Sequence, residues 1–96
     1  MKYNQTSLDK LETVLDESGY VYRYERGNFQ SGFCILEAKK VVVLNKFLSI
    51  DGRINTLIEL LSLLTIPTTT LTPQSLKTYN EAQHKYLSST QTALAS

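Results

Sequence analysis

This sequence is poor in the residues that most catalytic and metal sites use. Its 96 residues include one cysteine, Cys34, one histidine, His84, and no tryptophan. One Cys and one His cannot supply a disulfide framework or a Cys/His zinc site within one chain. We therefore expect no disulfide, no metal site and no cofactor. A single unpaired thiol also suits a reducing compartment, so the expected location is cytoplasmic.

The chain also lacks an excess of one charge and a long hydrophobic run. Its 10 Lys and Arg nearly balance 9 Asp and Glu, for a formal net charge of +1. This balance argues against nucleic acid or anionic lipid as the main partner. The longest nearly apolar run, 60–66, is far shorter than the roughly 20 residues of a membrane span. Residues 1–10 lack the apolar stretch of a signal peptide, so we expect no membrane or targeting segment.

Proline is rare, and the two prolines mark a division of the chain. Of the 19 charged residues, 16 precede Ile66, whereas 11 of the last 31 residues are Ser or Thr. Between these parts, Pro67, Pro73 and the threonines around them disfavour helix and favour an extended linker. The sequence predicts a core over 1–66, a linker over 67–73, and a C-terminal helix with a frayed tail over 74–96. We expect the tail to dock on the core or on a second subunit.

Hydrophobic spacing predicts an α+β fold with the order α-β-β-β-α-α. A first helix is expected over about 7–18, with Thr6 and Asp9 as its capping pair and Gly19 at its end. Three strands over 20–25, 33–37 and 41–44 should form an antiparallel meander, with 27–32 as a hairpin loop. Residues 37–40 are too few for anything but a second hairpin. The last strand is apolar at every position, which predicts a central strand covered on both faces.

A second helix, about 49–64, carries more apolar residues than one sheet face can cover. Leu60 and Leu63 widen its main stripe well past half of the circumference. A third helix, which Thr72 and Pro73 should open, could cover the spare side. We expect the helices to pack on one face of the sheet and to leave a self-association surface. The main stripe consists of Ile50, Ile54, Leu57, Ile58, Leu61 and Leu64.

The residues that could serve as catalytic or phosphate-binding groups all have ordinary structural explanations. Cys34 alternates with Phe33 and Ile35 within a strand and is predicted to be a buried structural thiol. His84 falls in the C-terminal part and should be a solvated helix residue. The glycines around residues 27–32 lack the spacing of a phosphate-binding loop. We therefore expect no catalytic residues and no enzyme activity.

The first strand places Tyr20, Tyr22 and Tyr24 on one face. Three tyrosines on one face form either an amphipathic wall against the helices or an open platform. An open platform with nearby cations would stack the bases of single-stranded nucleic acid. The near-neutral charge and the acids Glu25 and Glu37 count against that alternative.

The best candidate binding residues lie where the last strand turns into the second helix. Arg53 falls within the apolar arc of that helix, where its guanidinium needs a partner. An internal ion pair with Glu25 or Glu37 would satisfy it, and a ligand anion or an acid of a partner protein is the functional alternative. Asn45 and Lys46 add polar groups at the same corner. Phe29, at the tip of the first loop, either folds onto the core or is presented to a partner.

The strand ending Val43-Leu44-Asn45-Lys46 precedes a helix that reads Arg53-Ile54-Asn55-Thr56-Leu57-Ile58-Glu59-Leu60-Leu61. Together with the preceding helix and strands, over about residues 8–62, this layout resembles the core of ImmA/IrrE-type metallopeptidases. In that family the helix reads Thr-Leu-x-His-Glu-x-x-His. Thr56-Leu57 and Glu59-Leu60 are similar to the surroundings of that motif, in a register that needs a one-residue gap, and the helix has no histidine. The resemblance implies a non-catalytic relative without a zinc site.

Three functions follow from these patterns. The leading hypothesis is a small non-catalytic protein-interaction module that self-associates, as a homodimer, or binds another protein. The alternatives are an inactive remnant of a metallopeptidase-like core and a single-stranded nucleic-acid binder that uses the tyrosine face. The chain also has the look of short bacterial proteins. The candidate binding residues are Arg53, Lys46, Asn45, Phe29, Tyr22 and Tyr24.

Overall fold

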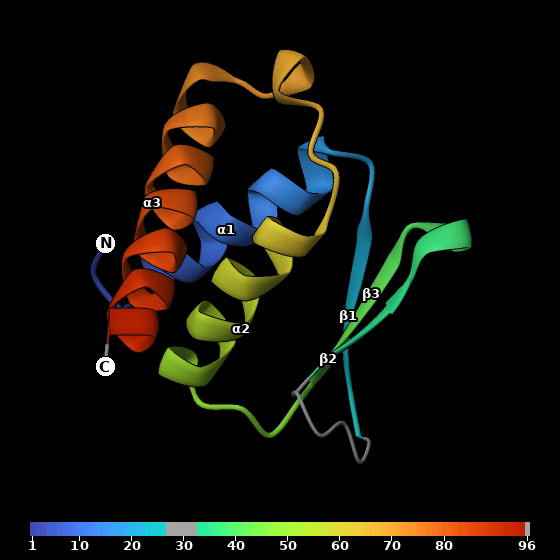
Figure 1. Ribbon diagram of the computed structural model, residues 1–96. Helices are drawn as coiled ribbons and strands as arrows, with labels where there is room; N and C mark the ends of the chain where they lie inside the picture. Colours follow the sequence, from blue (N-terminus) through green and yellow to red (C-terminus); the bar gives the residue numbers. More distant parts are fainter. Residues whose placement is uncertain (27–32, 96) are drawn as a thin grey trace.

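The structure is a computed structural model that describes residues 1–26 and 33–95, with side chains as far as residue 88. All three helices lie on the same side of a small sheet (Figure 1). The fold class predicted from the sequence is confirmed as α+β. The elements in chain order are α1 (Gln5–Glu17), β1 (Val21–Glu25), β2 (Phe33–Leu36), β3 (Val41–Asn45), α2 (Ile50–Leu63) and α3 (Pro73–Ala95).

The ends of α1 and α2 are fixed by short polar residues. The side chain of Asn4 accepts a hydrogen bond from the Ser7 amide, so α1 begins two residues earlier than predicted. The expected Thr6–Asp9 pair is therefore not the cap, since an Asx cap was available upstream. Gly19 follows α1 with φ +83°, a conformation that glycine adopts at little cost and that ends the helix as expected. Ser49 caps α2 through the Gly52 amide.

The sheet has the order β1-β3-β2 and is mixed. The predicted antiparallel meander is wrong, because β1 pairs with β3 in parallel while β2 pairs with β3 in the antiparallel sense. The most apolar strand, β3, takes the central position, and neighbours in sequence, β1 and β2, end up at opposite edges. The expected hairpin between β2 and β3 is confirmed, with a 3₁₀ turn at Glu37–Lys39 and Lys40 in the left-handed region at φ 52°. The predicted loop over 27–32 lies outside the described residues.

The hydrophobic core lies between the sheet and the helices. Val42 and Leu44 of β3 are fully buried, whereas Val41 and Val43 on its other face are only half-buried. The expectation that β3 is covered on both faces is therefore wrong, because every helix packs on one side. On α2, Leu60 is fully buried and Leu63 is 54% exposed. The helices thus cover most, but not all, of the wide apolar arc of α2.

The C-terminal segment packs on its own chain. Helix α3 contacts both α1 and α2, and Ala82 is fully buried between them. The Gln83 side-chain amide donates to the Leu61 carbonyl at 2.9 Å. The sequence predicts a frayed end over 88–96, whereas α3 extends to Ala95. Among the described residues, no helix has the length and hydrophobicity needed to cross a membrane.

Glu17, at the end of α1, joins that helix to the start of α3. Its carboxylate accepts hydrogen bonds from the Thr72 amide at 2.9 Å and from the Thr72 hydroxyl at 3.2 Å. The Thr72 hydroxyl in turn accepts from the Ser75 amide, as an N-cap does. These contacts, led by the Thr72 amide, hold the pKa of Glu17 below 4.5.

We expect Glu17→Gln to lower the melting temperature at neutral pH, because the amide is a weaker acceptor than the carboxylate. The folded pKa lies below the unfolded value of 4.5, so the stabilisation is complete above pH 4.5 and is lost as the pH falls through the folded pKa. Thermal unfolding at several pH values should therefore show the gap between the two proteins closing in acid. Glu59→Gln, at an exposed position of α2, is the control. A gap that does not change with pH would contradict the assignment.

Candidate functional site

The structure brings together most of the candidate residues at the corner between β3 and α2. Arg53 lies in the first turn of α2 and reaches back over the connecting loop. Its Nη2 donates to the Lys46 carbonyl at 3.0 Å and its Nε donates to the Leu48 carbonyl at 3.2 Å. The Asn45 side-chain oxygen accepts from the Phe47 amide at 3.0 Å, which fixes the start of the same loop. Arg53 and Asn45 therefore hold this corner in one conformation.

The guanidinium of Arg53 also stacks on an aromatic ring. It lies 4.3 Å from the centroid of the Tyr24 ring, and the Tyr24 hydroxyl donates to the Glu12 carboxylate on α1. Burial, followed by the hydrogen bond to Glu12, raises the pKa of Tyr24 well above its usual value. This chain of contacts ties α2 to β1 and β1 to α1.

The predicted ion pair of Arg53 with Glu25 or Glu37 is wrong. Backbone carbonyls and the Tyr24 ring satisfy the guanidinium instead. Glu25 lies on the opposite face of the sheet, where its carboxylate is 3.9 Å from Arg23. The side chain of Arg53 thus contacts two backbone carbonyls and one aromatic ring of its own chain. Its role is to position the loop at this corner.

The tyrosines of the first strand lie on the helix side of the sheet. Tyr20 is 5% exposed, and Tyr22 and Tyr24 pack against the core. The rings of Tyr22 and Tyr24 meet edge to face, with centroids 6.2 Å apart. Of the two arrangements predicted for these tyrosines, the structure has the amphipathic wall that packs against the helices.

The most exposed large apolar side chain at the corner is Phe47, which was not among the predicted residues. Phe47 is 68% exposed, and the centroid of its ring lies 5.8 Å from Arg26 Cζ and 5.7 Å from Lys46 Nζ. A single Phe in a short loop belongs to no hydrophobic repeat, so the sequence alone could not show whether its side chain is exposed or buried in the core. Phe29 lies outside the described residues.

A second candidate surface is the side of the sheet that faces away from the helices, here called the outer face. Cys34 is exposed on this face, so the predicted buried thiol is wrong. The strand alternates as expected, but none of the described helices or strands packs on the face to which Cys34 points. Val21 is 52% exposed and Leu36 is 46% exposed at its two edges. The outer face consists of Val21, Arg23, Glu25, Cys34, Leu36, Val41, Val43 and Asn45.

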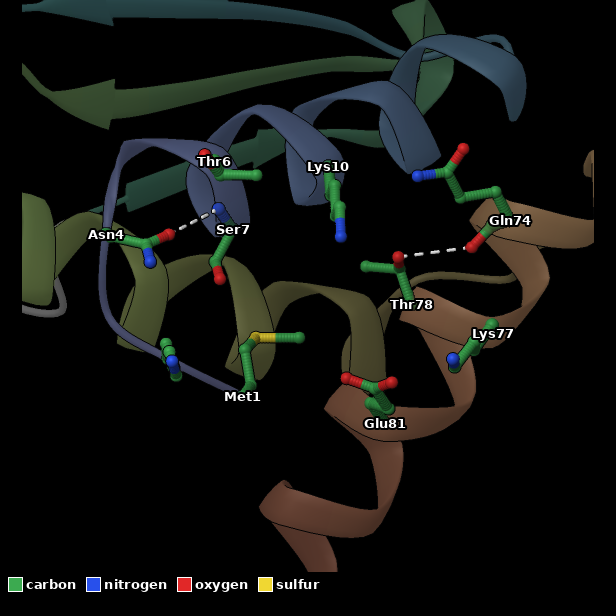
Figure 2. Close-up of a pocket in the computed structure, with 10 residues that line it drawn as sticks. Met1, Asn4, Thr6, Ser7, Lys10, Gln74, Lys77, Thr78 and Glu81 are labelled. Carbon is green, nitrogen blue, oxygen red and sulfur yellow. Dashed lines mark hydrogen bonds between the residues drawn. The ribbon is translucent and has the colours of Figure 1, made fainter.

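A cleft of about 380 Å³ lies between the first turns of α1 and the first turns of α3 (Figure 2). Figure 2 shows Lys10 reaching from α1 toward the space between the two helices, with Lys77 and Glu81 on the α3 side. No sequence pattern predicts this cleft, because its lysines come from segments far apart in the chain. We call it the α1–α3 cleft; it is lined by Met1, Lys2, Asn4, Thr6, Ser7, Lys10, Gln74, Lys77, Thr78 and Glu81.

Across residues 1–26 and 33–95, the structure holds no group of three or more His, Cys, Asp or Glu side chains placed to bind a metal ion. Comparison of the chain with protein-family models, with curated proteins and with solved structures found no match. The function of this chain must therefore be inferred from its own surfaces.

Proposed function

We propose that this protein is a small non-catalytic interaction module, two copies of which associate through the outer face of the sheet. The observation that carries the proposal is an apolar row across all three strands that no other element of the described residues covers. Val21, Val41 and Leu36 lie side by side in register, and Val43 and Cys34 lie next to them. Apolar surface of this kind on one side of a sheet is stabilised when a second layer covers it.

The order of residues in the row suits a second copy of the same chain. A two-fold axis parallel to β3 would place Val21 of one copy over Leu36 of the other, and Val41 over Val41. Apolar side chains would then meet apolar side chains along the whole row. Sheets that pack face to face in this way run at about 30° to each other, because each sheet is twisted.

The charges of the outer face are also compatible with self-association. Arg23 and Glu25 are its only charged residues, and they lie 3.9 Å apart with 62% and 52% of their side chains exposed. The face is therefore neutral, and two copies would approach without repulsion between like charges. The β3–α2 corner differs, because both charged groups around Phe47, Arg26 and Lys46, are cationic.

The size of the face sets the expected affinity. Three strands of about five residues span roughly 14 Å by 16 Å. This footprint is well below the roughly 800 Å² per partner of a standard stable interface. We therefore expect a reversible dimer that forms at high micromolar concentration.

Sedimentation measurements from about 10 μM to about 1 mM test the proposal directly, since a dimer of this size should form only in the upper part of that range. The weight-average mass should rise from that of a 10.9 kDa monomer toward twice that value, under reducing conditions. Because Cys34 lies on the outer face, its rate of labelling by a maleimide should fall over the same range. A constant mass and a constant labelling rate up to the highest concentration would contradict the proposal.

A further inference from the structure

The α1–α3 cleft has unpaired cations but few unpaired acids. Lys2, Lys10 and Lys77 line it from three separate segments of the chain. Figure 2 shows Lys10 on α1 and Lys77 on α3. The one ion pair of 4.0 Å or less among the described residues joins Arg23 to Glu25, on the other side of the molecule. None of the three lysine side chains makes a hydrogen bond or a ring contact with the described residues. Their ammonium groups are therefore available to a ligand.

All but one of the acidic side chains near the cleft already accept hydrogen bonds. A second cavity, of about 240 Å³, continues along the same groove and shares Thr6, Lys10, Gln74 and Thr78 with the first. Its acids are Asp9, which accepts from the Gln5 amide at 2.8 Å, and Glu17, which accepts from Thr72. Glu81 is the acid of the cleft itself, so three lysines face one carboxylate.

The neutral polar groups of the cleft add further donors. The Asn4 side-chain oxygen accepts from the Ser7 amide, which leaves the Asn4 amide group as a donor. The Thr78 hydroxyl donates to the Gln74 carbonyl and so offers its oxygen only as an acceptor. The lining is therefore dominated by ammonium and amide donors, and these groups recognise phosphate and carboxylate oxygens.

We propose that the α1–α3 cleft binds a small, multiply charged organic anion, such as a polycarboxylate or a phosphorylated metabolite. A volume of about 380 Å³ lies at the lower end of the range of small-molecule sites. Three lysines and one carboxylate lining so small a space favour a compact ligand with two or more negative charges. A nucleic-acid backbone needs a longer cationic track than this cleft supplies.

The test is a titration of the isotope-labelled protein with citrate and with pyrophosphate, followed by amide chemical shifts at constant ionic strength. Shifts should concentrate in residues 4–10 and 74–81, with saturation in the low millimolar range or below. Acetate, which carries one charge, should bind at least about tenfold more weakly. Shifts spread over all lysine-bearing segments, or none up to about 10 mM ligand, would overturn the proposal.

Three exposed substitutions sharpen the test because none is expected to affect folding. Lys10→Gln and Lys77→Gln should each weaken citrate binding by about fivefold, and Glu81→Gln should strengthen it by a few fold. The matched control is Lys39→Gln, on the β2–β3 turn, which should leave the affinity unchanged. An effect of Lys39→Gln equal to that of Lys10→Gln, or a weaker affinity in Glu81→Gln, would show that binding is only nonspecific surface attraction.

Discussion

Replacing Leu36 by lysine should abolish self-association while leaving the monomer folded. Leu36 lies at the edge of the outer face and is 46% exposed, so its replacement removes little from the core. In the proposed dimer the two-fold axis would bring two new ammonium groups into the apolar row. Burying an unpaired charge costs several kcal/mol, and every 1.4 kcal/mol is a factor of ten in affinity. We expect the dissociation constant to rise at least about 100-fold.

The measurement is sedimentation of the variant over the same range of concentration as the parent protein, with circular dichroism as the check on folding. Val21→Lys, at the opposite edge of the row, should have the same effect. The control is Leu87→Lys on α3, because Leu87 is 55% exposed and lies away from the sheet. If Leu36→Lys and Leu87→Lys weaken association equally, the interface lies elsewhere. If neither does, the outer face is not the contact.

Replacing Arg53 by alanine should lower the free energy of unfolding by about 2–3 kcal/mol. Hydrogen bonds from a charged donor contribute about 1.5–3 kcal/mol each when they are sheltered, and less when exposed. Arg53 donates two, and its stacking on Tyr24 adds roughly 0.5–1 kcal/mol. For a domain of this length the melting temperature should fall by roughly 10 °C or more.

Chemical and thermal unfolding of three variants distinguish a positioning role for Arg53 from a general effect of charge. Arg53→Lys should recover less than half of the loss, because an ammonium group cannot reproduce two divergent hydrogen bonds and planar stacking. Lys46→Ala removes a cation at the same corner but keeps the carbonyl that Arg53 uses, so it should be close to neutral. Equal stability of Arg53→Ala and Lys46→Ala would rule out the proposed role.

Local patterns predicted most elements but not the pairing of the strands. The apolar spacing of α2, the proline that opens α3 and the short turn before β3 are local signals, and all three are confirmed. The position of β1 depends on which strand occupies the centre of the sheet. Because β3 is the most apolar, burying it in the centre outweighs the tendency of β1 to pair with its neighbour in sequence.

The sites show the same division between local and distant contacts. The position of Arg53 in an apolar arc correctly indicated that it needs a partner. That partner proved to be backbone carbonyls and an aromatic ring, which no charge pattern in the sequence reveals. The lysines of the α1–α3 cleft are 75 positions apart at the extremes, from Lys2 to Lys77, and only the packing of α3 on α1 brings them to one place.

The central place of β3 also fixes the order in which the sheet can assemble. During synthesis, β1 and β2 leave the ribosome before the strand that joins them, and neither has its final neighbour until residue 45 has been added. The turn at Glu37–Lys39 lets β2 and β3 pair locally and quickly, whereas β1 must close a loop of about 20 residues to reach β3. Docking of β1 is therefore expected to be the late, rate-limiting step of folding, and nascent chains that end before β3 should expose the apolar face of α1 to chaperones.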